Sequence, residues 1–140
     1  MKESVTKKEF QVPSDLGEVQ KTSSRVLFFL KSLDLSEGTL FDIRLCLEEA
    51  LINAIKYGNK LKKELKVRLA VEFDEEEVRL TVEDQGKGFD PGQLKNCTEK
   101  GNVLRNSGRG VYLIHQLMDK VKYNSSGNCV VMVKRLKAQG

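Results

Sequence analysis

The strongest constraint on the fold is a strictly alternating stretch between residues 66 and 83. The acidic turn DEEE (74–77) divides it into two runs in which every second side chain is apolar: Val67, Leu69, Val71 and Phe73, then Val78, Leu80 and Val82. Alternation with period two places these side chains on one face of a strand, and two such runs joined by a short polar turn predict a β-hairpin. The chain therefore needs a sheet with one apolar face that other elements cover.

The first helix is expected over residues 15–33, after a short strand that ends at Pro13. Its apolar residues recur with a mostly helical period. Ser14 and Asp15 precede it as candidate N-caps, and Glu18 is placed to return the bond of a capping box.

A second helix is expected over residues 38–57, with Gly58 as its C-terminal cap. After the hairpin, residues 84–109 show little periodicity. A third helix over about 109–119 and a second hairpin over 120–136 complete the order β-α-α-β-β-loop-α-β-β. This order predicts an α/β (α+β) two-layer sandwich, in which a mixed, mostly antiparallel sheet is covered on one face by helices.

Composition indicates one globular domain over residues 1–140, with its core at about 10–136. Hydrophobic residues make up 39% of the chain and charged residues 31%, as in soluble folded proteins. No apolar run reaches the roughly 18 residues that cross a bilayer, and the N-terminus lacks the apolar region of a secretion signal. We therefore expect a cytoplasmic protein that does not contact a membrane.

Scattered cysteines and a single histidine argue against several kinds of site. Cys46, Cys97 and Cys129 show no CxxC spacing, which disfavours a disulfide framework and a zinc site. With His115 as the one histidine, metal hydrolases and histidine-based triads are poor candidates. The net charge is +4, and its densest cluster, at 60–66, contains no aromatic residue for base stacking. This cluster indicates a solvated loop, and we expect no direct nucleic-acid binding.

The expected second helix carries a narrow polar ridge. At about 100° per residue, four polar residues fall along one line: Asp42, Glu49, Asn53 and Lys56. Glu48 falls on another side, where it can pair with Arg44. A glutamate and an amide one turn apart could hold a hydrated Mg²⁺ and activate a hydroxyl or a water. An ordinary exposed helix stripe gives the same pair, so the ridge alone does not establish a site.

A second feature is VEDQGKGFDP (82–91), where Asp84 follows a strand directly and is itself followed by Gly86 and Gly88. Glycine permits positive φ angles and a close approach of the backbone to a flat ligand. A carboxylate at a strand end can accept a hydrogen bond from an exocyclic amino group such as that of adenine. The alternative is a turn that needs two glycines for its conformation.

A third feature is NSGRGVYLIHQL (106–117), in which Ser107, Gly108 and Gly110 lead into the third helix. Backbone N–H groups at a helix N-terminus favour phosphate. The alternative is an ordinary Ser/Gly helix start. The stretch is neither a Walker A loop nor a GxGxxG motif after a strand, so the P-loop and Rossmann interpretations fail.

In their order and spacing, these features resemble the GHKL (Bergerat-fold) ATPases and, within them, the anti-sigma-factor serine kinases of the SpoIIAB/RsbW type. The matching motifs are ExxxN at Glu49–Asn53, DxGxG at Asp84–Gly88 and SGRG at Ser107–Gly110. The resemblance covers about residues 10–136. It implies the histidine-kinase-like ATP-binding fold, with ATP and Mg²⁺ as cofactors.

The resemblance implies a role for each matching residue. Glu49 corresponds to the general base, and Asn53 to the ligand of the Mg²⁺ that bridges the phosphates. Asp84 corresponds to the acceptor of the adenine amino group, with Gly86 and Gly88 shaping the base pocket. The segment at about 91–107 corresponds to the ATP lid. Contacts with phosphate are implied for the SGRG motif, with Ser107, Gly108, Arg109 and Gly110. Lys100 and Arg105 lie in the lid and could reach phosphate, but no spacing rule fixes which of the two does.

The implied function is that of an anti-sigma factor with serine kinase activity in a partner-switching pathway. Such a protein binds a sigma factor in one nucleotide state, phosphorylates a STAS-domain anti-anti-sigma antagonist, and forms a homodimer. The alternative is a stand-alone nucleotide-dependent binding module that regulates a partner other than a sigma factor. Two positions depart from the family: Tyr57 replaces a common histidine, and Arg25 does not clearly match the docking arginine of the first helix.

Overall fold

The computed structural model describes residues 5–86 and 106–136, and of residues 106–111 only the backbone. The described strands form one sheet in the order β1-β2-β3-β5-β4, and every neighbouring pair is antiparallel. Their bounds are β1 (Thr6–Pro13), β2 (Lys66–Phe73), β3 (Glu77–Glu83), β4 (Lys120–Tyr123) and β5 (Cys129–Arg135). Both predicted hairpins are present, as β2–β3 and β4–β5.

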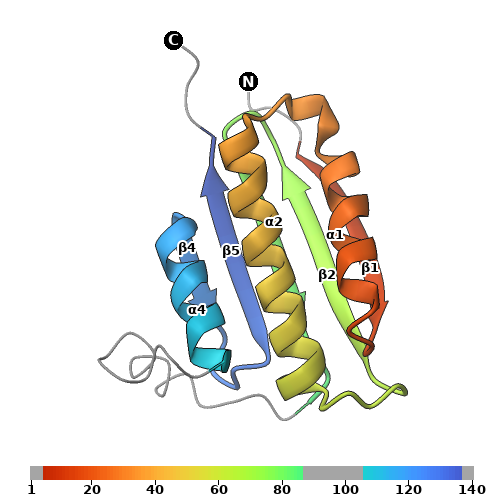
Figure 1. Ribbon diagram of the computed structural model, residues 1–140. Helices are drawn as coiled ribbons and strands as arrows, with labels where there is room; N and C mark the ends of the chain where they lie inside the picture. The colour runs from red at the N-terminus through yellow and green to blue at the C-terminus, as the bar shows by residue number, and fades with distance from the viewer. Residues whose placement is uncertain (1–4, 87–105, 137–140) are drawn as a thin grey trace.

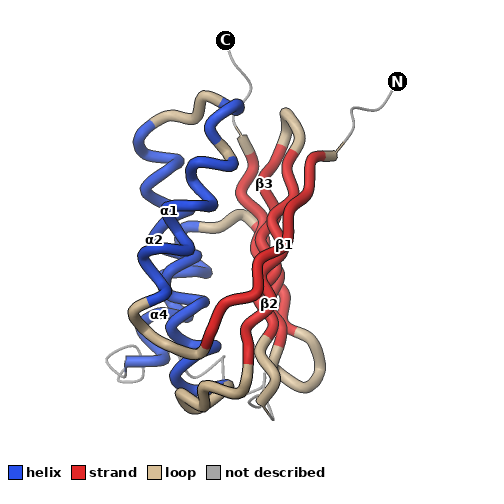
Figure 2. Tube along the Cα trace, turned by 90° about the vertical axis from the view of Figure 1, so that its right-hand side faces the viewer, coloured by secondary structure: helices blue, strands red, loops and turns tan. Residues whose placement is uncertain are grey.

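The described helices cover one face of the sheet (Figure 2). They are α1 (Glu18–Phe29), α2 (Glu37–Ile52) and α4 (Asn106–Leu117), and a 3₁₀ turn, η1 (Lys31–Leu33), follows α1 where the predicted helix continued. α2 lies between α1 and α4 (Figure 1) and packs against both. The alternating side chains of β2 and β3 form the centre of the core, each at most 2% exposed: Val67, Leu69, Val71, Val78, Leu80 and Val82.

The predicted two-layer sandwich is therefore confirmed, and its physical basis is the alternation that the hairpin shows in the sequence. The apolar face of the hairpin is sealed by the helices, and the other face carries charged side chains. No helix in the described ranges has both the length and the apolar character that a bilayer span requires.

The predicted capping box before α1 is wrong. Gly17 occupies the N-cap position, and no side chain in the described part of the chain caps the helix there. Ser14 is 2% exposed and donates its hydroxyl to the Leu65 carbonyl at 2.7 Å. Asp15 Oδ1 accepts the Gly17 N–H at 2.9 Å. Ser14 thus binds the loop before β2, a tertiary contact that no local pattern contains.

α2 widens at its end into a π-helical segment, η2 (Asn53–Gly58). Beyond it, the Asn59 N–H donates to the Ala54 carbonyl at 2.7 Å, a bond that reaches back five residues. Single π-helical turns inside helices are rare and often mark functional sites. The prediction that Gly58 caps this helix is wrong, because the cap position is Asn59, whose φ angle of −86° is right-handed.

α4 begins at Asn106, earlier than the predicted residue 109. Its C-terminal end is fastened to the sheet and to α2 by Lys134. The ammonium of Lys134, on β5, donates to the Leu117 carbonyl at 2.8 Å and to Asp42 Oδ2 at 3.1 Å. Lys134 therefore joins β5 to α2 and to the C-terminal end of α4, which is the end away from Ser107–Gly110.

Candidate functional site

Three segments that carry predicted site residues meet at one end of the molecule, the lower end in Figure 1. They are the C-terminal end of α2 with η2, the residues that follow β3, and the N-terminal end of α4. η2 contacts the segment after β3 directly, because the Cα of Gly58 lies against the Asp84 carboxylate. The β4–β5 turn reaches the same place, since Asn128 bonds to Asp84.

Glu49 and Asn53 share one face of α2, as the sequence predicts. The Asn53 N–H donates to the Glu49 carbonyl in the last turn, and both residues are partly buried. Cys46, one turn earlier, shows where this face points. Burial raises the pKa of the Cys46 thiol to about 12; the charge of Asp42 adds to the rise, Lys134 opposes it and Glu49 adds to it. Asp42 bonds to Lys134 of β5, so this side of α2 faces β5, and the Cys46 thiol stays protonated at neutral pH.

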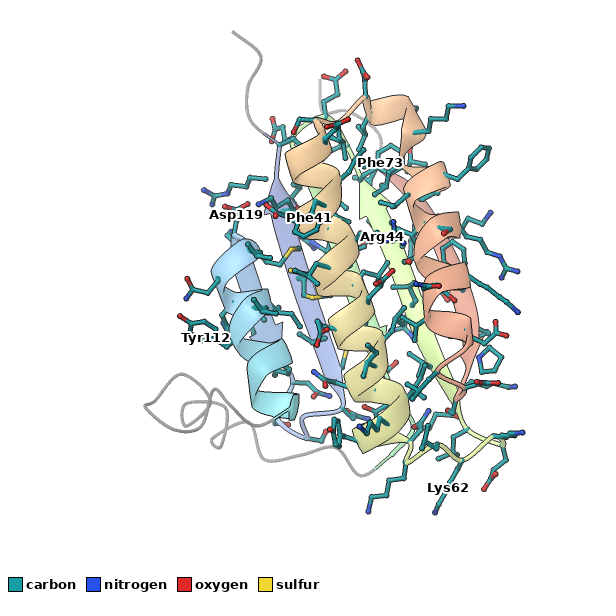
Figure 3. The ribbon with its side chains drawn as sticks, viewed as in Figure 1. Phe41, Arg44, Lys62, Phe73, Tyr112 and Asp119 are labelled. Carbon is teal, nitrogen blue, oxygen red and sulfur yellow. The ribbon has the colours of Figure 1, made fainter. Side chains whose placement is uncertain are left out.

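The neighbouring Glu48 points to the other side of α2, toward α1. It accepts the Ser23 hydroxyl at 2.5 Å and the Arg44 Nε–H at 3.1 Å. Arg44 lies on the α1 side of α2 in Figure 3. The predicted pairing of Glu48 with Arg44 is confirmed, and of the two adjacent carboxylates only Glu49 shares a face with Asn53.

The other two residues of the predicted ridge have different surroundings. Asp42 forms an ion pair with Lys134 and so belongs to the anchor of α4. Lys56 is exposed, and its ammonium lies 5.3 Å from the centre of the Tyr57 ring. Lys56 falls in the π-helical segment, where the spacing of 100° per residue does not hold. The ridge therefore reduces to the pair of Glu49 and Asn53.

Asp84 is a buried carboxylate, 7% exposed, directly after β3. The Gly86 N–H donates to its Oδ1 at 2.9 Å, and among the described residues no second donor reaches this carboxylate. Burial raises the pKa of Asp84 to about 6, the Gly86 N–H opposes the rise, and the nearby charge of Glu83 adds to it. Toward the described residues this buried carboxylate has acceptor capacity left, which suits a ligand that brings a hydrogen-bond donor.

Gly58 and Gly86 are sterically required around this carboxylate. A Cβ atom on Gly58 would lie 2.3 Å from Asp84 Cγ, and a Cβ atom on Gly86 would lie 1.8 Å from the Gly58 carbonyl oxygen. A side chain at position 58 would displace the Asp84 carboxylate, and a side chain at position 86 would displace the backbone of Gly58, which lies against it. The role expected for Gly86 in shaping a base pocket stays a prediction. The role of Gly58 was missed, because its partner is distant in sequence.

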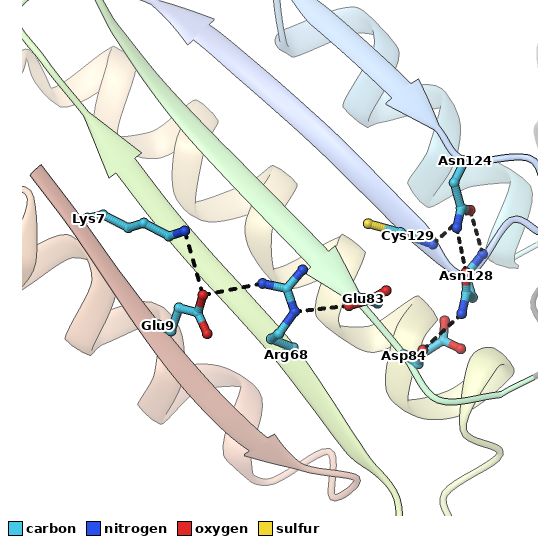
Figure 4. A network of polar contacts seen from close by, with 8 residues as sticks. All are labelled: Lys7, Glu9, Arg68, Glu83, Asp84, Asn124, Asn128 and Cys129. Atoms are coloured by element: carbon cyan, nitrogen blue, oxygen red, sulfur yellow. Dashed lines mark hydrogen bonds and ion pairs between the residues drawn. The ribbon is translucent and has the colours of Figure 1, made fainter. Parts of the chain in front are cut away.

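The β4–β5 turn holds the backbone of Asp84 from the other side (Figure 4). The Asp84 N–H donates to the Asn128 carbonyl at 2.9 Å, and Asn128 Nδ2 donates to the Asp84 carbonyl at 3.2 Å. Asn124 braces the turn, since its Oδ1 accepts the N–H groups of Asn128 and Cys129 at 3.0 and 3.2 Å. The sequence identified this turn but gave no sign that it supports the site.

The glycine motif of α4 is placed differently from the prediction. Ser107, Gly108, Arg109 and Gly110 lie inside α4, not in a loop before it. Ser107 and Gly108 belong to the first turn, whose N–H groups have no acceptor within the helix, so the capacity to bind an anion is retained. The remaining predicted residues, Gly88, Lys100 and Arg105, and most of the expected lid at 91–107, lie outside the described residues.

Comparisons with known proteins identify the family of the chain. The family model for the histidine kinase-like ATPase domain matches residues 12–134, a range that contains every motif above. The serine-protein kinase RsbW of Staphylococcus epidermidis is 32% identical over 106 residues, which cover 70% of this chain and 67% of that protein. The RsbW of Oceanobacillus iheyensis is 25% identical over 133 residues, which cover 91% of this chain and 82% of that protein.

Solved structures share the fold at low sequence identity. The crystal structure of the RsbU and RsbW domains of a Mycobacterium tuberculosis protein has a TM-score of 0.63 and 12% identity, and the match covers 94% of this chain but 32% of that longer one. A mycobacterial sensor histidine kinase, MprB, has a TM-score of 0.53 and 17% identity, covering 96% and 100%. At these identities the structures support the fold alone.

Proposed function

Because the chain belongs to the histidine kinase-like ATPase domain family, in the branch of the RsbW serine-protein kinases, we propose that it binds ATP at the site around Asp84 and phosphorylates a serine of a partner protein. The observation that carries the proposal is the close contact between Gly58, at the end of α2 and η2, and the Asp84 carboxylate. The helix that presents Glu49 and Asn53 ends against the buried carboxylate, which would bring the two parts of a nucleotide site next to each other.

The residues present fit an adenine nucleotide. Asp84 provides a buried acceptor for the adenine amino group, and the missing side chains of Gly58 and Gly86 leave the backbone close beside it. Asn53 would contribute a ligand to Mg²⁺. In the described ranges no group of three metal-ligating side chains occurs, so phosphate oxygens would complete the coordination. When bound, ATP supplies the phosphoryl group and Mg²⁺ offsets the charge of the phosphates.

Glu49 is the proposed general base. It would take the proton of the acceptor serine as the serine oxygen forms a bond to the γ-phosphorus and the bond to the ADP oxygen breaks. Glu48 cannot replace it, because Ser23 and Arg44 hold that carboxylate toward α1. The first turn of α4, with Ser107 and Gly108, would bind phosphate through backbone N–H groups, and Gly88, Lys100, Arg109, Gly110 and Arg105 keep the roles that the family resemblance gives them.

The proposed biological role is an anti-sigma factor in a partner-switching pathway. Its partners would be a sigma factor and a STAS-domain anti-anti-sigma antagonist that carries the acceptor serine, and it would act in the cytoplasm as a homodimer. The relationship to the RsbW kinases supports this role.

A pull-down from the native cell lysate, made with Mg-ATP and with Mg-ADP and read by mass spectrometry, tests the proposal. We expect a sigma factor in one nucleotide state and a STAS-domain protein with new phosphoserine in the ATP sample. A nucleotide-dependent catch that contains neither protein would favour a binding module with another partner. A catch that is the same with both nucleotides and contains no phosphoserine would contradict the kinase assignment.

A further inference from the structure

Asn59, which follows η2, is a buried polar residue that the proposed chemistry does not use. It is 1% exposed, yet its side chain makes three hydrogen bonds. Nδ2 donates to Ser14 Oγ at 2.9 Å and to the Lys66 carbonyl at 3.1 Å, and Oδ1 accepts the Gln85 N–H at 2.8 Å. Because a carbonyl can only accept and a backbone N–H can only donate, these partners fix the orientation of the amide.

The third bond reaches the segment that carries Asp84. The peptide unit between Asp84 and Gln85 is held at both of its polar groups, since Asn59 accepts its N–H and Asn128 donates to its carbonyl. Gln85 is held a second time, because its side-chain Oε1 accepts the Lys66 N–H at 2.6 Å. This peptide cannot turn without breaking a bond to a buried asparagine, and the direction of the adjacent Asp84 side chain depends on it.

We propose that Asn59 is a positioning residue for base recognition, which fixes the peptide after Asp84 and so aims the carboxylate at the amino group of the base. The inference rests on the proposed function, because it takes Asp84 as the adenine acceptor. Asn59 acts through Asp84. It also joins the base site to the helix that carries Glu49 and Asn53, since it directly follows the π-helical end of α2.

The consequence is a change in base selectivity. A correctly aimed carboxylate accepts a hydrogen bond from the 6-amino group of adenine and repels the 6-carbonyl of hypoxanthine, so ATP should bind more tightly than inosine triphosphate. Sites that hydrogen-bond a substrate group reject analogues without it by about 10⁴–10⁵-fold. Misplacing such a group by about 1 Å can remove on the order of 100-fold. A loss of general stability would weaken both nucleotides equally and leave the ratio unchanged.

The test is calorimetric titration of the full chain with ATP and with inosine triphosphate, each with Mg²⁺. We expect Asn59→Ala to reduce the ratio of the two affinities by about tenfold or more, and to have no effect on it in an Asp84→Asn background. Ser14→Ala is the matched control, because Ser14 is equally buried and bonds to Asn59 but does not contact Gln85. It should lower the melting temperature and leave the ratio unchanged.

The outcomes separate this inference from the function on which it rests. A wild-type protein that binds no ATP, or whose ratio does not depend on Asp84, would overturn the proposed function and this inference with it. A ratio that depends on Asp84 but is unchanged by Asn59→Ala would overturn the positioning role alone. If Asn59→Ala does not fold, the same affinity ratio measured for Gln85→Ala tests the positioning role instead. That exposed side chain provides the second hold on the same residue, so we expect a smaller drop in the ratio, and no drop would overturn the inference.

Discussion

Replacing Asp84 by asparagine should make the nucleotide-free protein more stable at neutral pH while removing the proposed preference for adenine. The carboxylate is 7% exposed, and burial raises its pKa from the ordinary 3.8 to about 6. At about 1.4 kcal/mol for each pKa unit, holding the ionised group in the folded protein costs about 3 kcal/mol. Asparagine has nearly the same shape and keeps an oxygen for the Gly86 N–H, but it carries no charge.

The sign of the pH dependence follows from the raised pKa. Between about pH 4 and pH 6 the folded protein holds a proton on Asp84 that the unfolded chain has released. The contribution of Asp84 to stability therefore falls as the pH rises from about 4 to 6. Above pH 6 this contribution stays constant at its lowest value. The full gain from Asp84→Asn is expected at pH 7.5 and almost none of it at pH 4.

Urea unfolding at pH 7.5 and at pH 4, followed by circular dichroism because the chain has no tryptophan, measures this difference. A gain of about 3 kcal/mol corresponds to a melting temperature roughly 10 °C higher for a chain of this size. ATP titration of the same variant should show weakened binding. A variant less stable than wild type at pH 7.5, or a difference that does not change with pH, would refute the argument that Asp84 is a desolvated carboxylate.

Three further predictions follow from the same contacts. Gly58→Ala places a Cβ atom 2.3 Å from the Asp84 carboxylate and should abolish ATP binding in a titration, whereas Gly38→Ala, with nothing within 4 Å, should leave it unchanged; equal binding by both variants would contradict the steric role. ATP affinity should fall by up to about tenfold per pH unit below pH 6, because the protonated Asp84 carboxyl is a weaker hydrogen-bond acceptor for the amino group of the base. The pH dependence of ATP affinity in Asp84→Asn corrects for protonation of the phosphates. Parallel curves of affinity against pH for the two proteins would exclude Asp84 as the titrating group. Lys134→Met should lower the unfolding free energy by about 1–3 kcal/mol in urea, because it leaves Asp42 and the end of α4 without their partner; an unchanged midpoint would show that the anchor contributes nothing.

The parts of the fold that depend on local periodicity could be predicted from the sequence. The alternation of Val67–Phe73 and Val78–Val82 gave the central hairpin, because one buried face demands that register. Glu48 and Glu49 were correctly assigned to different faces of α2, because α2 is a regular α-helix up to Ile52 and a spacing of about 100° per residue applies there.

The remaining features depend on contacts between distant segments. Ser14 fits the local pattern of a helix cap, but it is buried and bonds instead to Leu65 and Asn59. Gly58 fits the pattern of a helix stop, but its purpose is to make room for Asp84. A π-helical turn has no signature in a pattern based on 3.6 residues per turn. The helical wheel therefore placed Lys56 on the polar ridge of α2, although the regular α-helix ends at Ile52.

The measurement that tests the central claim most directly is phosphoryl transfer from radiolabelled ATP to the proposed STAS-domain partner, compared between Glu49→Ala and Glu48→Ala. The two carboxylates are adjacent, so the pair controls for charge and position in the chain. We predict that Glu49→Ala binds Mg-ATP with nearly the affinity of wild type but transfers phosphate more slowly by about 10²–10⁴-fold, and that Glu48→Ala is less stable yet transfers normally. Normal transfer by Glu49→Ala, or a loss of transfer confined to Glu48→Ala, would contradict the account.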